Sequence, residues 1–451
     1  MDPENAFLEP GSLTKCITIC EPSGLPALRN TAIRLSPPGK ERDIRAFDQM
    51  NPTDSERESY IRKITDELDQ IADQLIIWRR HFHRNPELSG QEFATTEYLS
   101  QQLSAAGVDH RIVPTGRGII AESAQVDDPS RPLIAFRADI DALPINEENA
   151  VPYCSTREGV MHACGHDAHS AILLGTTLAF QRAGSLPIRW RSVFQPAEEF
   201  GNGARQMVEF GALNDAQAII AVHVDPTRPV GLLGVTPGPR TAFCQDFEIR
   251  IKGRGGHAAR PHLAIDPIAV AAQLVATIYQ NIPRATDARA PVVATIGMLS
   301  AGTTSNVIPE TALLKGTIRA LDKSVAESAR ETLQRICSGL ALSSGAEVEP
   351  IFERLLNGLT NDPRVAAICA TAARELAQEG CLIENDPPSM GAEDFADYVV
   401  AVPGCMMALG SRIQDKAITP LHTPRFDIDE AVLLFGARLL ARVLLLWPSA
   451  L

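Results

Sequence analysis

Residues 161–169 read MHACGHDAH and hold three histidines, a cysteine and an aspartate within nine positions. All of these side chains can bind a divalent cation, and no other window of the chain is so rich in them. Cys164 and His166 would point the same way on an extended strand, and a tight turn at Gly165 would also let both reach one centre. A single Cys-x-His pair is weak evidence, because most cysteines are small buried apolar groups. The stretch predicts a metal site only if further ligands come from elsewhere in the chain.

Further candidate ligands follow short apolar runs that have the pattern of buried strands. The run LIAF leads into Asp139, IRWRSVFQ leads into Glu198 and Glu199, and AIIAVHV carries His223 near its end. Taken singly, Asp139 could cap a turn, Glu198 and Glu199 could form a solvated acidic turn, and His223 could be a core histidine. Functional groups in an open α/β sheet gather at the carboxyl ends of its strands, so we expect them to meet beside residues 161–169. Adjacent residues on an extended backbone point apart, which would let one glutamate bind a cation while the other reaches a water.

Periodic patterns predict helices around these strands. One helix is expected from Thr53 or Ser55 to the proline at position 86, with a second at 91–106 and a third at 170–183. The first has apolar residues at intervals of three and four, the spacing of one buried face. These residues are Ile64, Leu68, Ile71, Leu75, Trp78 and Phe82. Residues 1–52, rich in proline, glycine and mixed charge, predict an irregular extension.

The segment that begins at residue 237 has a different order of elements. Strands are expected at 243–253, 290–299, 311–321 and 346–355, with helices at 266–282 and 324–342. The order β-α-β-β-α-β is that of a ferredoxin-like α+β domain. The predicted organisation is therefore an extension (1–52), an α/β domain in two parts (53–236 and 357–451) and an inserted ferredoxin-like domain (237–356).

Length and composition limit the class of protein. A chain of 451 residues is too long for one core, and its net charge of -13 without a basic stripe argues against a nucleic-acid partner. Nine scattered cysteines favour a reducing compartment, and the first residues lack the pattern of a secretory signal, so a cytoplasmic location is expected. The apolar run at 431–447 is too short to span a membrane and contains Arg438 and Arg442. We expect it to be a helix packed on the core, with no membrane partner.

Seven motifs occur in a fixed order along the chain: MHACGHDAH, QPAEE, AVHV, GRGGHAARPH, SNVIPE, MGAEDF and LHTPRFD. With the ferredoxin-like insert, they resemble the dinuclear metallo-aminoacylase and carboxypeptidase family over about residues 60–447. The similarity is greater to its branch of hippurate hydrolases, N-acyl-amino-acid amidohydrolases and auxin-conjugate hydrolases. The resemblance implies a zinc-exopeptidase-like catalytic domain, a mixed sheet flanked by helices, and an insert that acts as a lid or dimerisation domain.

The resemblance also implies two divalent ions, with zinc, manganese, cobalt and nickel as candidates. The implied ligands are Cys164, His166, Glu199, His223 and His422. Cys164 would take the bridging place that an aspartate fills in other branches. Arg137 stands where those branches have a histidine ligand, so His166 would replace that histidine. Asp139 is then expected to orient a ligand rather than to bind a cation.

The implied reaction is hydrolysis of the amide bond of a small N-acyl amino acid. Glu198 would remove a proton from the attacking water and later deliver it to the departing amine. His257, in the glycine-rich turn of the insert, would donate a hydrogen bond to the carbonyl oxygen in the active site of a partner subunit. Asn306 and Arg319 would bind the substrate carboxylate or support the dimer. The expected assembly is a homodimer or a larger assembly of dimers.

Two alternatives belong to other classes. A dipeptidase, a carboxypeptidase or another deacylase could use the same scaffold, although Cys164 in place of an aspartate favours the amidohydrolase branch. A non-catalytic metal-binding homologue could use the insert to bind a partner. Such a protein would be expected to lack Glu198 or one of the ligands, and this chain has them all.

Overall fold

The computed structural model describes residues 54–123, 131–376 and 381–448, so the expected extension at 1–52 lies outside it. The larger of its sheets has eight strands in the order β1-β2-β4-β3-β5-β16-β6-β15. These are β1 (Asp109–Ile112), β2 (Ile119–Glu122), β3 (Leu133–Asp139), β4 (Arg189–Gln195), β5 (Ala216–Pro229), β6 (Leu233–Gly234), β15 (Leu382–Ile383) and β16 (Gly404–Arg412). The four central strands, β4, β3, β5 and β16, are parallel, and antiparallel pairs at either side make the sheet mixed.

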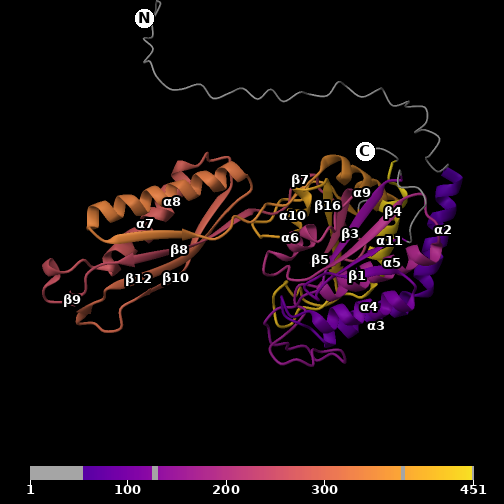
Figure 1. Cartoon of the computed structure of the whole chain (residues 1–451), viewed down its shortest axis with the longest axis horizontal. Helices are drawn as coiled ribbons and strands as arrows, with labels where there is room; N and C mark the ends of the chain where they lie inside the picture. The colour runs from indigo at the N-terminus through magenta and orange to yellow at the C-terminus, as the bar shows by residue number, and fades with distance from the viewer. Residues whose placement is uncertain (1–53, 124–130, 377–380, 449–451) are drawn as a thin grey trace, which may run out of the picture. The chain divides into compact units, whose positions relative to one another are not determined.

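Both faces of the large sheet are covered by helices (Figure 1). Ile134 and Phe136 of β3 point into one core and Ala135 between them into another, as the period of two in a strand requires. The first core is formed with α2 (Asp54–Gln70), α3 (Ala72–Arg84), α4 (Phe93–Ala105), α5 (His166–Ala183), α9 (Pro363–Leu376) and α11 (Ala431–Leu445). The second is formed with α6 (Gly203–Glu209) and α10 (Phe395–Val399). Strands buried on both faces explain the near-continuous apolar runs in the sequence.

Two helices differ from the sequence prediction. The first predicted helix is divided into α2 and α3 at Ile71, whose φ of -109° and ψ of 13° leave the helical region. Both parts pack on α5, and all six apolar positions expected on one face are buried. Helix α5 begins at His166 rather than at Ser170, because Gly165 makes the turn that precedes it.

The insert has the split order that the sequence predicts. Its strands are β8 (Phe243–Lys252), β10 (Val292–Ala301), β12 (Thr311–Ala320) and β13 (Glu347–Phe352), and its helices are α7 (Pro267–Ala285) and α8 (Lys323–Ser344). The strands pair antiparallel in the order β10-β12-β8-β13, which is the ferredoxin-like arrangement. The two helices run side by side along this sheet (Figure 1) and share a core with it. The boundaries at 237 and 356 remain predictions.

Two short ribbons complete the insert and its connections. β9 (Gly256–His257) pairs with β11 (Val307–Ile308), and β7 (Gly238–Pro239) pairs with β14 (Thr360–Asn361). The β7–β14 ribbon joins the segments that lead into and out of the insert. The chain therefore leaves and re-enters the large domain, the one that contains the eight-stranded sheet, at one place.

Helix α11 takes up most of the apolar run near the end of the chain. It is largely buried, and its two arginines lie at the edge, where Arg438 pairs with Asp69 and Arg442 lies 2.9 Å from Glu375. Within the described ranges, none of the helices combines the length and apolar character needed to cross a membrane.

Candidate metal centre

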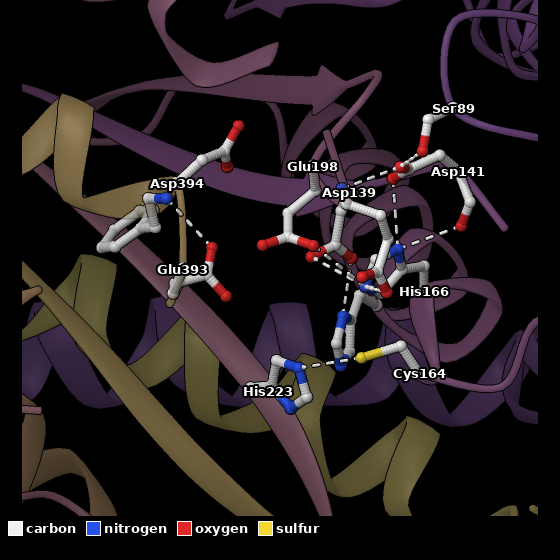
Figure 2. Close-up of polar contacts among 12 residues, drawn as sticks. Ser89, Asp139, Asp141, Cys164, His166, Glu198, His223, Glu393 and Asp394 are labelled. Carbon is white, nitrogen blue, oxygen red and sulfur yellow. Dashed lines mark hydrogen bonds and ion pairs between the residues drawn. The ribbon is translucent and has the colours of Figure 1, made fainter. Parts of the chain in front are cut away.

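The carboxyl ends of β3 and β4 lie next to the middle of β5 in the large sheet. Asp139 ends β3 and is in register with Gln195 at the end of β4, so the segment after β4 brings Glu198 and Glu199 to the same place. His223 reaches it from within β5, which continues to Pro229, so this residue is not near the end of its strand as the sequence suggests. Figure 2 shows the side chains of Asp139, Glu198 and His223 gathered with Cys164 and His166. The parallel strands therefore bring together residues that are remote in sequence.

Gly165 places Cys164 and His166 on either side of a tight turn. Its φ is 83°, a left-handed conformation that other residues rarely adopt, and an added Cβ would lie 2.3 Å from Cγ2 of Val224. Glycine is therefore required here for its conformation and for its size. The turn lets Cys164, just before α5, and His166, the first residue of α5, face one centre.

His422 approaches from the segment that precedes α11. Its φ of 60° is also left-handed, and its backbone N–H donates to the carbonyl oxygen of Ala163 at 2.8 Å. This hydrogen bond fixes the segment to the 161–169 stretch, so a ligand from near the end of the chain reaches the site.

The five expected ligands form two overlapping groups that share Cys164. The first group is Cys164, His166 and His223, and the second is Cys164, Glu199 and His422; within each, the ligand atoms lie within 4.8 Å of one another. Sγ of Cys164 is 3.6 Å from Nε2 of His223 and 3.3 Å from Nε2 of His422. Oε1 of Glu199 is 3.5 Å from Nε2 of His422 and 3.9 Å from Nε2 of His166. The sulfur therefore lies where it could contact two cations.

Backbone carbonyls select the ring nitrogens that face this centre. Nδ1 of His166 donates to the carbonyl oxygen of Asp141 at 3.0 Å, and Nδ1 of His223 donates to that of Val224 at 2.9 Å. A carbonyl can only accept, so Nδ1 carries a proton in both rings, and the neutral form of each ring has a free lone pair on Nε2. Hydrogen bonds of this kind orient the histidine ligands of metal sites.

Two buried atoms of the cluster lack a hydrogen-bond partner among the described residues. They are Nε2 of His166 and Oε1 of Glu199. Buried polar atoms are nearly always paired, so an unpaired nitrogen and an unpaired oxygen 3.9 Å apart fit positions that contact a cation. Imidazole, carboxylate and thiolate together suit zinc or a neighbouring transition metal. The donor set therefore fits a metal centre.

Burial controls the charges of the cluster. It raises the pKa of the Cys164 thiol well above its ordinary value, so ionisation of the thiol requires positive charge beside it. Burial, together with the nearby ring of His169, lowers the pKa of His223 to about 3 and keeps this ring neutral. The neutral ring of His223 is ready to bind a cation, whereas Cys164 binds as a thiolate and would lose its proton only with a cation beside it.

Glu198 lies beside the ligands, and it also forms an acidic group with Glu393 and Asp394. Its Oε2 is 3.9 Å from Nε2 of His166, and Figure 2 shows it between His166 and Glu393. Burial and the carboxylates of Glu393 and Asp394 raise the pKa of Glu198 well above its ordinary value. A carboxyl group with a raised pKa is suited to exchange protons near neutral pH.

Asp139 lies behind the ligands and is held by His169 and Arg137. Its Oδ1 is 2.7 Å from Nδ1 of His169, and its Oδ2 accepts from Nη1 of Arg137 at 2.6 Å. Burial alone would raise the pKa of Asp139, but His166 and Arg137 outweigh it and lower that pKa well below its ordinary value. Arg137 is itself buried and also donates to Gln195, Glu393 and Asp394. It thus joins the end of β3 to the GAEDF loop instead of serving as a ligand.

The three expected residues of the insert have different surroundings. Arg319 donates to the carbonyl oxygen of Met390 at 2.9 Å and lines a cavity of about 1000 Å³, whose wall also includes Cys164 and Glu198. His257 and Asn306 are exposed on the β9–β11 ribbon, where the carbonyl oxygen of Asn306 accepts from the N–H of Ala258 at 3.1 Å. Neither residue is among the described residues that line the cavity.

Two supporting carboxylates are not among the site residues predicted from the sequence. Asp141 accepts from Ser89 at 2.6 Å and from the N–H of Glu199 at 3.0 Å, and its Oδ1 is 3.2 Å from Nδ1 of His166. Glu92 accepts from the N–H of Ala197 at 2.8 Å. The signal for Asp141 is its place as the second carboxylate after the LIAF strand, whereas no sequence signal connects Glu92 with the QPAEE motif.

Comparisons with known proteins agree with this site. The chain matches the peptidase family M20/M25/M40 over residues 135–446. It is 38% identical to an N-acetylcysteine deacetylase of Bacillus subtilis, over 82% of this chain and 96% of that protein. It is 35% identical to thermostable carboxypeptidase 2 of Saccharolobus solfataricus, over 84% of this chain and 96% of that protein.

A solved structure also matches the chain. It is the YXEP protein of Bacillus subtilis, described as a dinuclear metal-binding peptidase of the M20 family. The TM-score is 0.73 at 35% identity, and the match covers 85% of this chain and all of that one. The chain therefore belongs to the peptidase family M20/M25/M40. It is a hydrolase that acts on amide bonds.

Proposed function

We propose that this hydrolase cleaves N-acyl amino acids to a carboxylic acid and a free amino acid. The observation that carries the proposal is the position of Glu198, a buried carboxylate beside five convergent ligands. The relative named as an N-acetylcysteine deacetylase, which matches over nearly its whole length, supports this class of substrate.

We further propose that two divalent cations are held by the five ligands, with Cys164 between them. The two groups that share its sulfur support this arrangement, as does the matched structure described as dinuclear. When bound, the cations would supply Lewis-acid chemistry, which lowers the pKa of water and polarises a carbonyl oxygen. Zinc, manganese, cobalt and nickel all suit this donor set.

Glu198 would carry the protons of the reaction. Its carboxylate takes a proton from the attacking water as the water oxygen bonds to the carbonyl carbon of the substrate. It then passes this proton to the amide nitrogen as the C–N bond breaks, so the amino acid leaves as an amine and the acyl group as a carboxylic acid. The raised pKa of Glu198 suits both transfers, because the proton is accepted and released within one cycle.

Residues of the insert would bind the substrate. Arg319 lines the same cavity as Glu198, and a guanidinium can pair with the carboxylate of an amino acid through two hydrogen bonds. His257 and Asn306 share one exposed ribbon, and we propose that they act in a homodimer, where His257 donates to the carbonyl oxygen in the partner subunit. Losing such a donor costs about a hundredfold in turnover.

A substrate panel tests the proposal. The purified protein, loaded separately with zinc, manganese, cobalt or nickel, is given N-acetyl, N-benzoyl and indoleacetyl amino acids beside unblocked dipeptides, and release of free amino acid is measured. Faster release from acyl conjugates is the expected result. The relative named as a carboxypeptidase favours a second candidate, a peptidase. Cleavage of dipeptides without cleavage of any acyl conjugate would establish that alternative.

A further inference from the structure

The segment that carries Glu198 has an unusual conformation at the residue before it. Ala197 has a φ of 54° and is buried. A residue with a Cβ rarely adopts this left-handed conformation unless its surroundings impose it. The direction in which Glu198 leaves the backbone depends directly on this φ.

Buried carboxylates hold the backbone on both sides of Glu198. The N–H of Ala197 donates to Oε1 of Glu92 at 2.8 Å, and the N–H of Glu199 donates to Oδ2 of Asp141 at 3.0 Å. The carbonyl oxygen of Ala197 accepts from the N–H of Gly203 at 3.2 Å. Glu92 and Asp141 therefore act on different residues: one on the residue before Glu198, and the other on a ligand.

Glu92 is itself fixed and fully buried. It stands just before α4, where its carbonyl oxygen accepts from the N–H of Thr96 at 3.1 Å, and its Oε1 also accepts from the N–H of Gly90 at 2.8 Å. Its Oε2 has no hydrogen-bond partner among the described residues. The hydrogen bonds of the carboxyl group are thus made by one oxygen, and one of them goes to Ala197.

We propose that Glu92 is a positioning residue for Glu198, an inference that rests on the proposed role of Glu198 in proton transfer. Its hydrogen bond keeps Ala197 left-handed and so directs the Glu198 carboxylate toward the ligands. Without this acceptor, Ala197 relaxes toward the usual right-handed region and Glu198 is displaced. The cations remain bound, because the N–H of Glu199 is held by Asp141.

The test compares two substitutions of similar volume. Glu92→Met removes the acceptor, whereas Glu92→Gln can keep an oxygen toward Ala197 and place its amide nitrogen at the position of the unpaired Oε2. We expect Glu92→Met to lower kcat about 30-fold or more, with KM changed less than about threefold and normal metal content, since small displacements of catalytic groups cost this much. Glu92→Gln should keep kcat within about fivefold of the wild type, because the hydrogen bond survives.

Glu87→Met is the matched control. Oε2 of Glu87, also buried, accepts from the N–H of Thr95 at 2.8 Å and from its hydroxyl at 2.9 Å. Like Glu92→Met, this variant loses two hydrogen bonds, but both of them come from Thr95 in the first turn of α4 and neither reaches the Glu198 segment. It should lower the melting temperature comparably and change kcat less than about threefold.

A double-mutant cycle with Ala197→Gly tests the route through residue 197. Glycine adopts the left-handed conformation without strain, so Glu92→Met should cost clearly less kcat in the Ala197→Gly background. If Glu92→Met does not fold, a second variant changes the other residue of this hydrogen bond. Ala197→Val places a β-branched side chain at residue 197, which disturbs the same φ, and it should lower kcat while metal is retained.

Several results would overturn the inference. These are equal losses of kcat in Glu92→Met and Glu87→Met, loss of metal in Glu92→Met or Ala197→Val, and equal effects of Glu92→Met in both backgrounds. All measurements use the amide that the wild type cleaves fastest. If that amide is a dipeptide, the proposed substrate class is wrong, whereas the role of Glu92 is still decided by the variants.

Discussion

Sγ of Cys164 and Nε2 of His422 lie 3.3 Å apart although 258 positions separate these residues in the chain. The backbone N–H of His422 also donates to the carbonyl oxygen of Ala163. This hydrogen bond fixes the segment before α11 to the segment that leads into α5. The ligand set is complete only when the two ends of the large domain have packed together. Metal binding should therefore stabilise the packed state.

Substitution of Cys164 tests whether its sulfur holds the cations. Cys164→Ala should lose metal and lower activity by about a hundredfold or more, since even residues that only support a ligand cost up to that much. Metal content per chain is measured after gel filtration. Cys154→Ala is the control, because its half-buried thiol contacts the carbonyl oxygen of Asn149 and no ligand. Normal metal content in Cys164→Ala would contradict the assignment.

Substitution of Glu198 should lower kcat without loss of metal, whereas substitution of its neighbour Glu199 should remove metal. Glu198→Gln should keep metal and lower kcat by about a hundredfold to ten-thousandfold, the usual contribution of a general base. Glu199→Gln should instead lose metal, because its carboxylate oxygen contacts the histidine ligands. Metal analysis and kinetics on the same samples separate the two. Loss of metal in both variants would show that Glu198 is also a ligand.

Much of the fold, and the grouping of the candidate ligands in space, could be predicted because both follow from local patterns. Buried parallel strands are continuous apolar runs, and a group that follows one strand lies beside residues of the neighbouring strands, so the sequence alone predicts that Glu199 and His223 lie close together. The insert was predictable because each of its elements has its own period and clear ends.

Other features depend on contacts between distant segments and have no local signal. Arg137 is a polar residue at the end of an apolar run, and nothing near it in sequence indicates its partners Glu393 and Asp394. The division of the first helix at Ile71 arises where both of its parts pack on α5, while the apolar spacing continues across it. The left-handed φ of Ala197 is imposed by tertiary hydrogen bonds, because alanine itself disfavours it.

Two glycines near the site allow the steric effect of an added Cβ to be distinguished from the cost of a left-handed backbone. Gly165 and Gly159 have φ values of 83° and 75°, but an added Cβ would clash with Val224 only at Gly165. Gly159→Ala should cost about 1–2 kcal/mol from the left-handed conformation alone, and Gly165→Ala should cost more and weaken metal binding. Urea unfolding and metal titration of both variants provide the comparison. Equal costs would mean that the contact with Val224 is readily relieved.

Neighbouring arginines on α3 allow a buried ion-pair network to be compared with an exposed pair. Arg79 is fully buried and contacts Asp167 at 2.8 Å, Asp427 at 3.0 Å and Glu430 at 3.3 Å. Arg79→Met leaves these carboxylates without their shared cation and should lower the free energy of unfolding by about 3–5 kcal/mol. Arg80 is 46% exposed, and Glu430 is its ion-pair partner among the described residues, so Arg80→Met should cost less than about 1 kcal/mol. Urea denaturation measures both, and similar losses would exclude a special role for Arg79.

His83 should make stability depend on pH in a defined direction. Its Nδ1 is 2.8 Å from Asp167 and its Nε2 is 3.1 Å from Glu147. Burial and Arg79 would lower the pKa of His83, but the two carboxylates outweigh them and raise it above the ordinary 6.5. A raised folded-state pKa stabilises the fold fully below pH 6.5, and this contribution is lost as pH rises through the folded-state value.

The measurement is the melting temperature of the wild type and of His83→Gln between about pH 5 and pH 9. The advantage of the wild type should shrink as pH rises, and titration of the metal ligands, common to both proteins, cancels in the comparison. His81→Gln is the opposing control, because burial lowers the pKa of His81 and its contribution is lost as pH falls instead. A wild-type advantage over His83→Gln that grows with pH would show that His83 is neutral in the folded protein.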